Sequence, residues 1–300
     1  MKLATFKARA GWANVGLVLD DEVVDLTAVL RSYRRNVLKR RGRGPETMLG
    51  WIEAGLLKRT FLKRLFSYVR RQTVRGARIP RKRVLLLAPI PRPPKIFGLG
   101  LNYAAHAAES GREPPEHPIV FAKAPTCVVG HNERVVIKRG VGRVDPEVEL
   151  AVVIGRAGAD IAEGAAMRHV AGYTIMNDVT ARDMQRRDLD RSHPWLRSKS
   201  IDTFGPMGPW IVTPDEIPDP HALDIEIRVN GTVRQHANTR QMIFPIPRLI
   251  AFISQYIRLE PGYVISTGTP EGIAPVAPGD VMECTIEGIG TLRNPVVLGR

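Results

Sequence analysis

The amino-acid sequence predicts an α+β protein that is rich in β-structure and divides into two parts near residue 90. From residue 96 onward, short apolar runs alternate with glycine and proline, and few helical patterns interrupt them. A stiff stretch with prolines at positions 89, 91, 93 and 94 separates these runs from the first third of the chain. We therefore expect a small domain and its linker at residues 1–90 and a larger domain at residues 91–300.

The first third combines a small sheet with a helical region. Short strands are expected at 3–7, 15–19 and 23–26. From Pro45 onward, apolar residues recur at helical spacing as far as Val69, and basic residues fill much of the remaining circumference. Such a basic amphipathic helix can lie on a membrane surface, but more often it packs on its own domain.

Positive charge is concentrated in the same third. Residues 1–95 contain 23 Lys and Arg against 6 Asp and Glu, whereas residues 96–300 contain 21 against 24. A basic field of this kind attracts polyanions in a salt-dependent way. The basic residues are not interleaved with aromatic residues and belong to no motif that recognises nucleic-acid bases, so we expect no specific nucleic-acid binding. A solvated arginine-rich surface is the simpler explanation of the excess positive charge.

The number and spacing of the cysteines, together with the hydropathy, indicate the cellular compartment in which the protein resides. Cys127 and Cys284 lie far apart and outside any metal-ligand spacing, which is typical of a reducing interior. No apolar run reaches the length of a membrane span, and the first residues do not form a signal peptide. We expect a cytoplasmic protein without membrane contact.

Two further patterns place elements in the larger part. The segments 225–229 and 233–236 flank Asn230-Gly231, a strong signal for a β-hairpin. Apolar residues recur at helical spacing between positions 246 and 257, ahead of Pro261-Gly262, which predicts a helix that packs on the core.

Two carboxylates stand at the start of an apolar run in the middle of the chain. Glu147 and Glu149 are two residues apart, and side chains at this spacing share one face of a strand. The run 150–154 is continuously apolar and stops at Gly155, as in a strand that is buried on both faces. The alternative is that both glutamates line the wet face of an ordinary strand.

A third carboxylate, Asp178, follows another expected strand at 172–176. Like charges held beside a core repel one another and need a compensating cation. Three carboxylates with open positions suit magnesium, manganese or calcium.

Other polar residues could move protons or bind an anion. His106 and Glu109 are three apart in a helix-compatible stretch, where the carboxylate could orient the imidazole as a base. Lys123 and Lys199 each stand among less polar neighbours, and buried lysines bind carboxylates or developing negative charge. The alternatives are that His106 and Glu109 are simply an exposed pair on a helix and that the two lysines lie on the surface.

Two segments could support these groups. A helix that begins at Asp178 would project Arg182 and Gln185 along its first turns, and the guanidinium fork matches a carboxylate. The turn 267–272, after an expected strand at 263–266, could bring backbone amides close to a ligand. The sequence contains neither a dinucleotide fingerprint nor a serine or cysteine nucleophile elbow.

Together these motifs resemble the fumarylacetoacetate hydrolase superfamily, in the branch of acylpyruvate hydrolases, oxaloacetate decarboxylases or tautomerases, and hydroxyhepta-diene-dioate isomerases. The resemblance covers residues 85–300 and is carried, in order, by segments 100–103, 121–123, 147–155, 177–183, 202–210 and 267–270, together with His106, Glu109 and Lys199. It implies a mixed β-sandwich roll of that family's C-terminal domain type, a small N-terminal α+β domain and a homodimer.

The resemblance also implies a role for each site residue. The metal ligands would be Glu147, Glu149 and Asp178. The catalytic residues would be His106, Glu109 and Lys199. The substrate-binding residues would be Lys123, Arg182, Gln185 and Thr269.

The implied activity is metal-dependent cleavage of a carbon–carbon bond in a 2,4-dioxo acid, such as an acylpyruvate, through a metal-stabilised enolate. Mg²⁺ is the expected ion, with Mn²⁺ or Ca²⁺ as alternatives, and residues 91–300 would form the catalytic domain. Oxaloacetate decarboxylation or tautomerisation and 2-hydroxyhepta-2,4-diene-1,7-dioate isomerisation share the enolate and remain alternatives. A non-catalytic protein that binds polyanions through its basic N-terminal part is the competing class.

Overall fold

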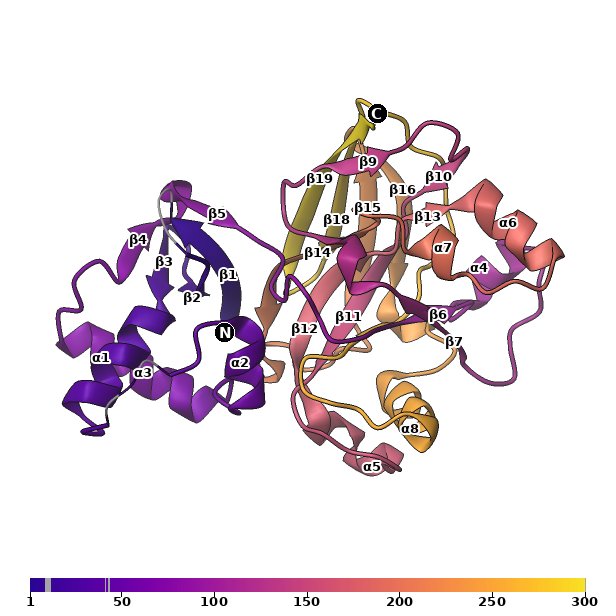
Figure 1. Ribbon diagram of the computed structural model, residues 1–300. Helices are drawn as coiled ribbons and strands as arrows, with labels where there is room; N and C mark the ends of the chain where they lie inside the picture. The colour runs from indigo at the N-terminus through magenta and orange to yellow at the C-terminus, as the bar shows by residue number, and fades with distance from the viewer. Residues whose placement is uncertain (9–11, 41, 43, 300) are drawn as a thin grey trace.

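The fold is dominated by β-sheet, with helices gathered at the periphery (Figure 1). The computed structural model describes residues 1–8, 12–40, 42 and 44–299. Within these residues the strands form a twelve-stranded, a five-stranded and a two-stranded sheet. The predicted α+β, β-rich class is confirmed.

The largest sheet runs through both parts of the chain. Its order is β4-β3-β2-β1-β14-β12-β11-β17-β6-β7, with β5 on β1 and β8 on β14. Its strands are β1 (Lys2–Ala8), β2 (Asn14–Val18), β3 (Glu22–Asp25), β4 (Arg78–Pro80), β5 (Val84–Leu86), β6 (Ile96–Gly100), β7 (Ile119–Lys123), β8 (Val128–Val129), β11 (Val148–Ile154), β12 (Val170–Asn177), β14 (Gly205–Val212) and β17 (Val264–Ser266). Because β1 pairs antiparallel with β14, at Leu3 opposite Ile211, the N-terminal strands extend the sheet of the larger part.

The second sheet faces part of the first. Its order is β16-β15-β18-β19-β9, and the small third sheet pairs β10 with β13. These strands are β9 (Val135–Ile137), β10 (Val144–Asp145), β13 (Thr180–Ala181), β15 (Asp224–Val229), β16 (Thr232–Asn238), β18 (Val281–Ile286) and β19 (Gly290–Leu298). The predicted hairpin joins β15 to β16, with positive φ at Asn230 and Gly231 as its tight turn requires.

Strand β11 lies between two hydrophobic cores. Leu150 and Val152 belong to a core shared with Ile225 of the five-stranded sheet. Ala151 and Val153, which point the other way, belong to a core shared with the N-terminal strands and helices. The strand is therefore buried on both faces, as its continuous apolar run predicted.

The helices cover the margins of the sheets. They are α1 (Leu26–Asn36), α2 (Met48–Glu53), α3 (Arg59–Arg71), α4 (Ala104–Glu109), α5 (Glu163–Ala166), α6 (Arg182–Asp190), α7 (Leu196–Lys199) and α8 (Ile246–Tyr256), with 3₁₀ turns η1 (Arg81–Arg83), η2 (Pro125–Cys127), η3 (Met167–His169), η4 (Pro214–Glu216) and η5 (Thr239–Gln241). In Figure 1, α1, α2 and α3 gather around the N-terminal strands, whereas α4, α6 and α7 lie at the far side of the larger part. The helix predicted between positions 246 and 257 is confirmed as α8.

The N-terminal helices differ from the single helix expected after Pro45. The chain forms α2 and α3 instead, separated at Gly55, whose φ of +64° does not fit a helix. Helix α3 buries Leu62, Leu65 and Val69 in the core, so it packs on its own domain.

Helix α1 was not predicted from the sequence, because arginines at positions 31, 34 and 35 obscure its apolar pattern. The Asp25 side chain caps its first turn, accepting a hydrogen bond from the Ala28 amide at 2.9 Å. Val29 and Leu30 are buried, whereas Arg31 and Arg35 are exposed.

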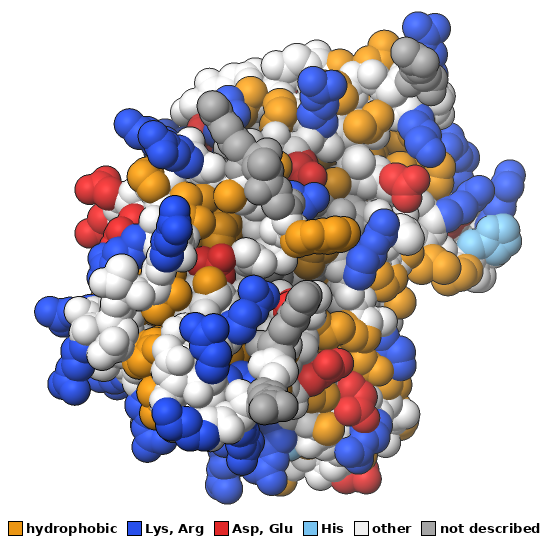
Figure 2. All heavy atoms as spheres, turned by 60° about the vertical axis from the view of Figure 1, so that its left-hand side comes forward, with side chains coloured by type: hydrophobic (Ala, Val, Ile, Leu, Met, Phe, Trp, Pro, Cys, Tyr) orange, Lys and Arg blue, Asp and Glu red, His pale blue; other side chains and the backbone are white. Residues whose placement is uncertain are grey.

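Lys and Arg side chains cover much of the face that the N-terminal part presents, and acidic side chains are few there (Figure 2). Among the described residues, no helix combines the length and apolar character needed to cross a membrane.

Candidate metal centre and active site

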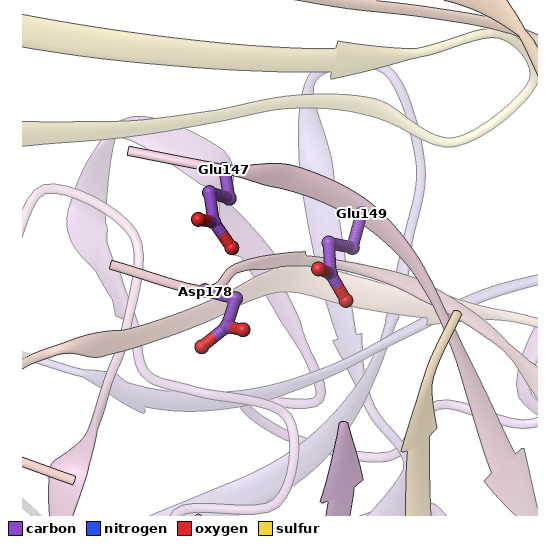
Figure 3. A group of neighbouring side chains, drawn as sticks. All are labelled: Glu147, Glu149 and Asp178. Carbon is purple, nitrogen blue, oxygen red and sulfur yellow. The ribbon is translucent and has the colours of Figure 1, made fainter. Parts of the chain in front are cut away.

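Three carboxylates converge where β11 begins and β12 ends (Figure 3). In this antiparallel pair Val148 lies opposite Asn177, and the Asp178 amide donates to the Glu147 carbonyl at 2.8 Å. One oxygen from each of Glu147, Glu149 and Asp178 lies within 4.8 Å of the others. The three residues are only 3%, 1% and 0% exposed, so the alternative of a wet strand face is wrong.

Two buried lysines hold part of this negative charge. Lys199 Nζ donates to Glu147 Oε2 at 2.7 Å and to Asp178 Oδ2 at 2.6 Å. Lys123 Nζ donates to Asp178 Oδ1 at 2.6 Å and to the Lys199 carbonyl oxygen. Neither is a surface lysine.

Arg182 contacts the same cluster from the start of α6. Its guanidinium pairs with Glu147, and its Nη1 donates to Gln185 Oε1 at 2.6 Å. The helix begins at Arg182 and not at Asp178 as expected, because residues 180–181 first pair with β10 as strand β13. The later start still directs Arg182 and Gln185 to the site.

Glu149 is the carboxylate that no described cation contacts directly. Its Oε2 accepts hydrogen bonds from Ser266 Oγ at 2.5 Å and from the Gly268 amide at 3.0 Å. Gly268 has φ of +93°, and a Cβ there would lie 2.8 Å from the Asn102 Cβ. Glycine is thus required for the turn to bring its amide to the carboxylate.

The surroundings separate the pKa values of the two glutamates. Burial, reinforced by the charges of Asp178 and Glu147, raises the pKa of Glu149 to about 8. Burial also disfavours the charged form of Glu147, but Lys199 and Arg182 outweigh it and hold its pKa below the ordinary value. An ionised Glu149 would therefore need another cation beside it, and the all-carboxylate donor set of the cluster fits a hard divalent ion.

If Glu149 acts as a metal ligand, metal affinity should depend on pH, because the carboxyl group must lose its proton to bind the ion. Below its pKa of about 8 an incoming ion has to displace that proton. We expect Mg²⁺ affinity to fall about tenfold for each pH unit below 8 and to level off above it. Calorimetry between pH 6 and 9, in buffers of different ionisation enthalpy, should show close to one proton released per ion at neutral pH. A pH-independent affinity would contradict the assignment.

His106 and Glu109 lie on α4, at the wall of a cavity of about 270 Å³. His106 Nδ1 lies 3.3 Å from Glu109 Oε2, and Glu109 Oε1 accepts a hydrogen bond from the Gly272 amide at 3.1 Å. The expected helical pair is therefore present, with His106 largely buried. The same cavity is lined by Glu147, Glu149, Arg182, Gln185, Lys199 and Thr269.

Thr269 lines the cavity, but its hydroxyl is engaged by the protein. Thr269 Oγ1 donates to the Val148 carbonyl at 2.9 Å and accepts from Gln235 Nε2 at 2.9 Å. Gln235 is buried, and its Oε1 accepts from the Val148 amide at 3.1 Å. Gln235 could not be predicted from the sequence, because it lies in a hairpin strand that carries no signal of the site.

Two more positioning residues are Asp145, just before the segment 147–155, and Asn177, inside the segment 177–183; neither was given a role from the sequence. Asp145 Oδ2 accepts from Arg182 Nε at 2.7 Å, and Asn177 Oδ1 accepts from the Glu147 amide at 2.9 Å. Both are fully buried beside the carboxylates they support. Their burial, and hence their role, could not be inferred from spacing.

Comparison with known proteins gives a consistent result. A family model described as fumarylacetoacetate (FAA) hydrolase C-terminal matches residues 95–297. The mitochondrial oxaloacetate tautomerase Fahd2a of Rattus norvegicus is 41% identical over 260 residues, which cover 84% of this chain and 80% of that protein.

Solved structures of similar proteins extend over nearly the whole chain. Maleylpyruvate hydrolase from Sphingobium sp. SYK-6, in complex with manganese(II) and pyruvate, is 32% identical with a TM-score of 0.79 and covers 100% of both chains. The 2-hydroxyhepta-2,4-diene-1,7-dioate isomerase of Mycobacterium marinum is 32% identical with a TM-score of 0.75 and covers 99% of this chain and 98% of that one. The chain belongs to the fumarylacetoacetate hydrolase family, which includes hydrolases, isomerases and tautomerases.

Proposed function

We propose that the protein is a divalent-metal-dependent hydrolase that cleaves a carbon–carbon bond in a 2,4-dioxo acid of the acylpyruvate type. The observation that carries this proposal is the position of the His106–Glu109 pair, which lines the same cavity as Glu147 and Glu149, two of the three buried carboxylates. A carboxylate-oriented imidazole is a suitable base for activating water.

Glu147, Glu149 and Asp178 would hold the ion, because they offer hard oxygen donors at short mutual distances. Mg²⁺ or Mn²⁺ is proposed, with Ca²⁺ as an alternative. When bound there, the ion supplies Lewis-acid polarisation of the carboxylate and 2-oxo oxygens of the substrate.

The chain's own groups bind the substrate and move the proton. The ammonium of Lys199 and the guanidinium of Arg182 line the cavity and face the negative charge of a 2-oxo acid. His106, oriented by Glu109, accepts a proton from water as its oxygen attacks the 4-oxo carbon. The bond between carbons 3 and 4 then breaks, and its electron pair stays on carbon 3 as the pyruvate enolate. His106 returns the proton to that carbon, which yields pyruvate and a carboxylic acid.

Oxaloacetate tautomerisation is the second candidate. It is favoured by the 41% identity to the Rattus norvegicus tautomerase across most of this chain. That reaction needs proton transfer next to the carbonyl and no attack by water, and decarboxylation of oxaloacetate would use the same groups.

Product analysis separates the candidates. The protein, loaded with Mg²⁺ or Mn²⁺, is incubated separately with acetylpyruvate, fumarylpyruvate and oxaloacetate, and a chelator-treated sample serves as control. We expect pyruvate together with acetate or fumarate from the first two acids. Consumption of oxaloacetate alone, or acceleration of keto–enol exchange alone, would replace the hydrolase proposal by the second candidate.

A further inference from the structure

The turn 267–272 contacts both halves of the site. Its Gly268 amide donates to Glu149 Oε2 at 3.0 Å, and its Gly272 amide, four residues further on, donates to Glu109 Oε1 at 3.1 Å. Glu149 belongs to the carboxylate cluster, whereas Glu109 belongs to the proposed acid/base pair. A single short stretch of backbone therefore joins the proposed metal centre to the group that orients the base.

No regular secondary structure fixes this turn. Within the described residues, the backbone of residues 268–275 forms no hydrogen bond with other backbone groups. The nearest such bonds on either side are those of Thr267 with Leu150 and of Val276 with Val144. Because the backbone polar groups of a turn need partners, side chains must hold this one in place.

Gln235 holds the middle of the turn. The residue is 1% exposed, and its Nε2 donates to Thr269 Oγ1 at 2.9 Å and to the Pro270 carbonyl at 2.7 Å. Its Oε1 accepts from the Val148 amide at 3.1 Å, at the start of β11. A flip of the side-chain amide would set donor against donor at Val148 and acceptor against acceptor at Pro270. The side chain is therefore fixed in one orientation and ties the turn to β11.

The backbone of β16 lies directly against the same turn. A Cβ at Gly272 would overlap the Arg234 carbonyl oxygen, so glycine is needed for the chain to approach β16 this closely. The strand thus limits the turn at Gly272, while the Gln235 side chain limits it at Pro270. Loss of the Gln235 contacts would free the turn two residues before the Gly272 amide.

Glu109 depends on that amide for its orientation. Its side chain is 32% exposed, so packing alone does not fix the carboxylate. Among the residues that the structure describes, it contacts His106 through Oε2 at 3.3 Å and the Gly272 amide through Oε1. A displacement of about 1 Å at a catalytic group can cost about 100-fold in rate. The position of the Gly272 amide therefore determines how well Glu109 aligns His106.

We propose that Gln235 is a positioning residue of the active site. By tying the turn 267–272 to the start of β11, it sets the position of the Gly272 amide and, through it, the orientation of Glu109 toward His106. This inference rests on the proposed function only for the role of the His106–Glu109 pair in proton transfer.

Gln235→Met tests the inference, because methionine has a similar length and lacks the amide. With acetylpyruvate and saturating Mn²⁺, kcat should fall about 10- to 100-fold, while KM and Mn²⁺ affinity stay within about threefold. In Glu109→Ala the carboxylate is already absent, so adding Gln235→Met to it should lower kcat by less than about threefold more. Losses that multiply in the double variant would show that Gln235 does not act through Glu109.

A second readout needs no turnover. In protein labelled with ¹⁵N-glycine and kept in excess Mg²⁺, the amide resonance of Gly272 reports its hydrogen bond to Glu109. Gln235→Met and Glu109→Ala should shift this resonance in the same direction. Thr269→Val removes the hydroxyl that accepts from Gln235 but keeps the shape of the side chain, so it should cause a smaller shift and serves as the test if Gln235→Met does not fold. A Gly272 resonance that does not move would overturn the inference.

Asn294→Leu is the matched control. Asn294 is another buried amide of the five-stranded sheet, donates to two backbone carbonyls at 2.8 and 2.9 Å, and lies outside the cavity lining. The control should lower the melting temperature as Gln235→Met does, yet leave kcat and the Gly272 resonance unchanged. An equal loss of kcat in Asn294→Leu would reduce Gln235 to a structural role. If the resonance shifts are found but no 2,4-dioxo acid is cleaved, the proposed reaction fails and the positioning of Glu109 stands.

Discussion

Replacing Glu149 with glutamine is expected to weaken Mg²⁺ binding by at least about 100-fold, since even residues behind the ligands contribute 10- to 100-fold in metal sites. The amide keeps the size of the side chain and can still accept hydrogen bonds from Ser266 and Gly268. It removes the carboxylate of Glu149, the only one of the three cluster carboxylates that no described cation contacts directly. The loss of affinity therefore isolates the charge of Glu149 from its role in holding the turn.

Calorimetry and thermal unfolding measure this effect together. In the unmodified protein, excess Mg²⁺ should raise the melting temperature, because ligand binding to the folded state stabilises it by mass action. Glu149→Gln should fold normally without metal and lose this rise. Glu260→Gln, a surface change with its partner Arg258 nearby, is the control. Mg²⁺ affinity that is unchanged in Glu149→Gln would remove this metal site from the protein.

Replacing His106 with alanine should reduce turnover by about 10²- to 10⁴-fold, the usual contribution of a general acid or base. Among the described residues the imidazole forms an ion pair with Glu109 and no hydrogen bond or ion pair with the three carboxylates, so metal affinity should stay within about twofold. Steady-state kinetics with an acylpyruvate and calorimetry with Mn²⁺ give the two readouts.

The matched control is His117→Ala, because His117 stacks on Phe252 and is not part of the cavity lining. It should keep near-normal turnover. A loss of less than tenfold in His106→Ala would assign proton transfer to another group. A parallel loss of Mn²⁺ affinity would instead indicate that His106 supports the ion.

The part of the site that could be predicted from the sequence is the part that strand geometry determines, namely the positions of the three carboxylates. Glu147 and Glu149 could be placed on one face because side chains alternate along a strand, and Asp178 because it ends a neighbouring apolar run. What could not be predicted was the antiparallel register of β11 with β12, which brings Glu147 beside Asp178. Register depends on pairing across the sheet and not on local pattern.

The remaining differences have tertiary causes. Strand β13 delays α6 by pairing with β10, a contact between segments far apart in the sequence. Helix α1 is stabilised by buried Val29 and Leu30 despite its basic composition, and Gln235 reaches the site from a distant hairpin. Local propensity is a weak predictor wherever packing of this kind decides the structure.

The pairing of β1 with β14 limits how the chain can be divided. Removing residues 1–90 would leave backbone donors and acceptors of β14 unpaired at Ile211 and would expose the apolar side chains of Met207 and Ile211. An edge strand with unpaired backbone groups promotes association with other chains. In the intact chain the N-terminal part covers this edge and apolar face of the larger part, and another segment could replace it only if it supplied both a matching strand and a matching apolar face.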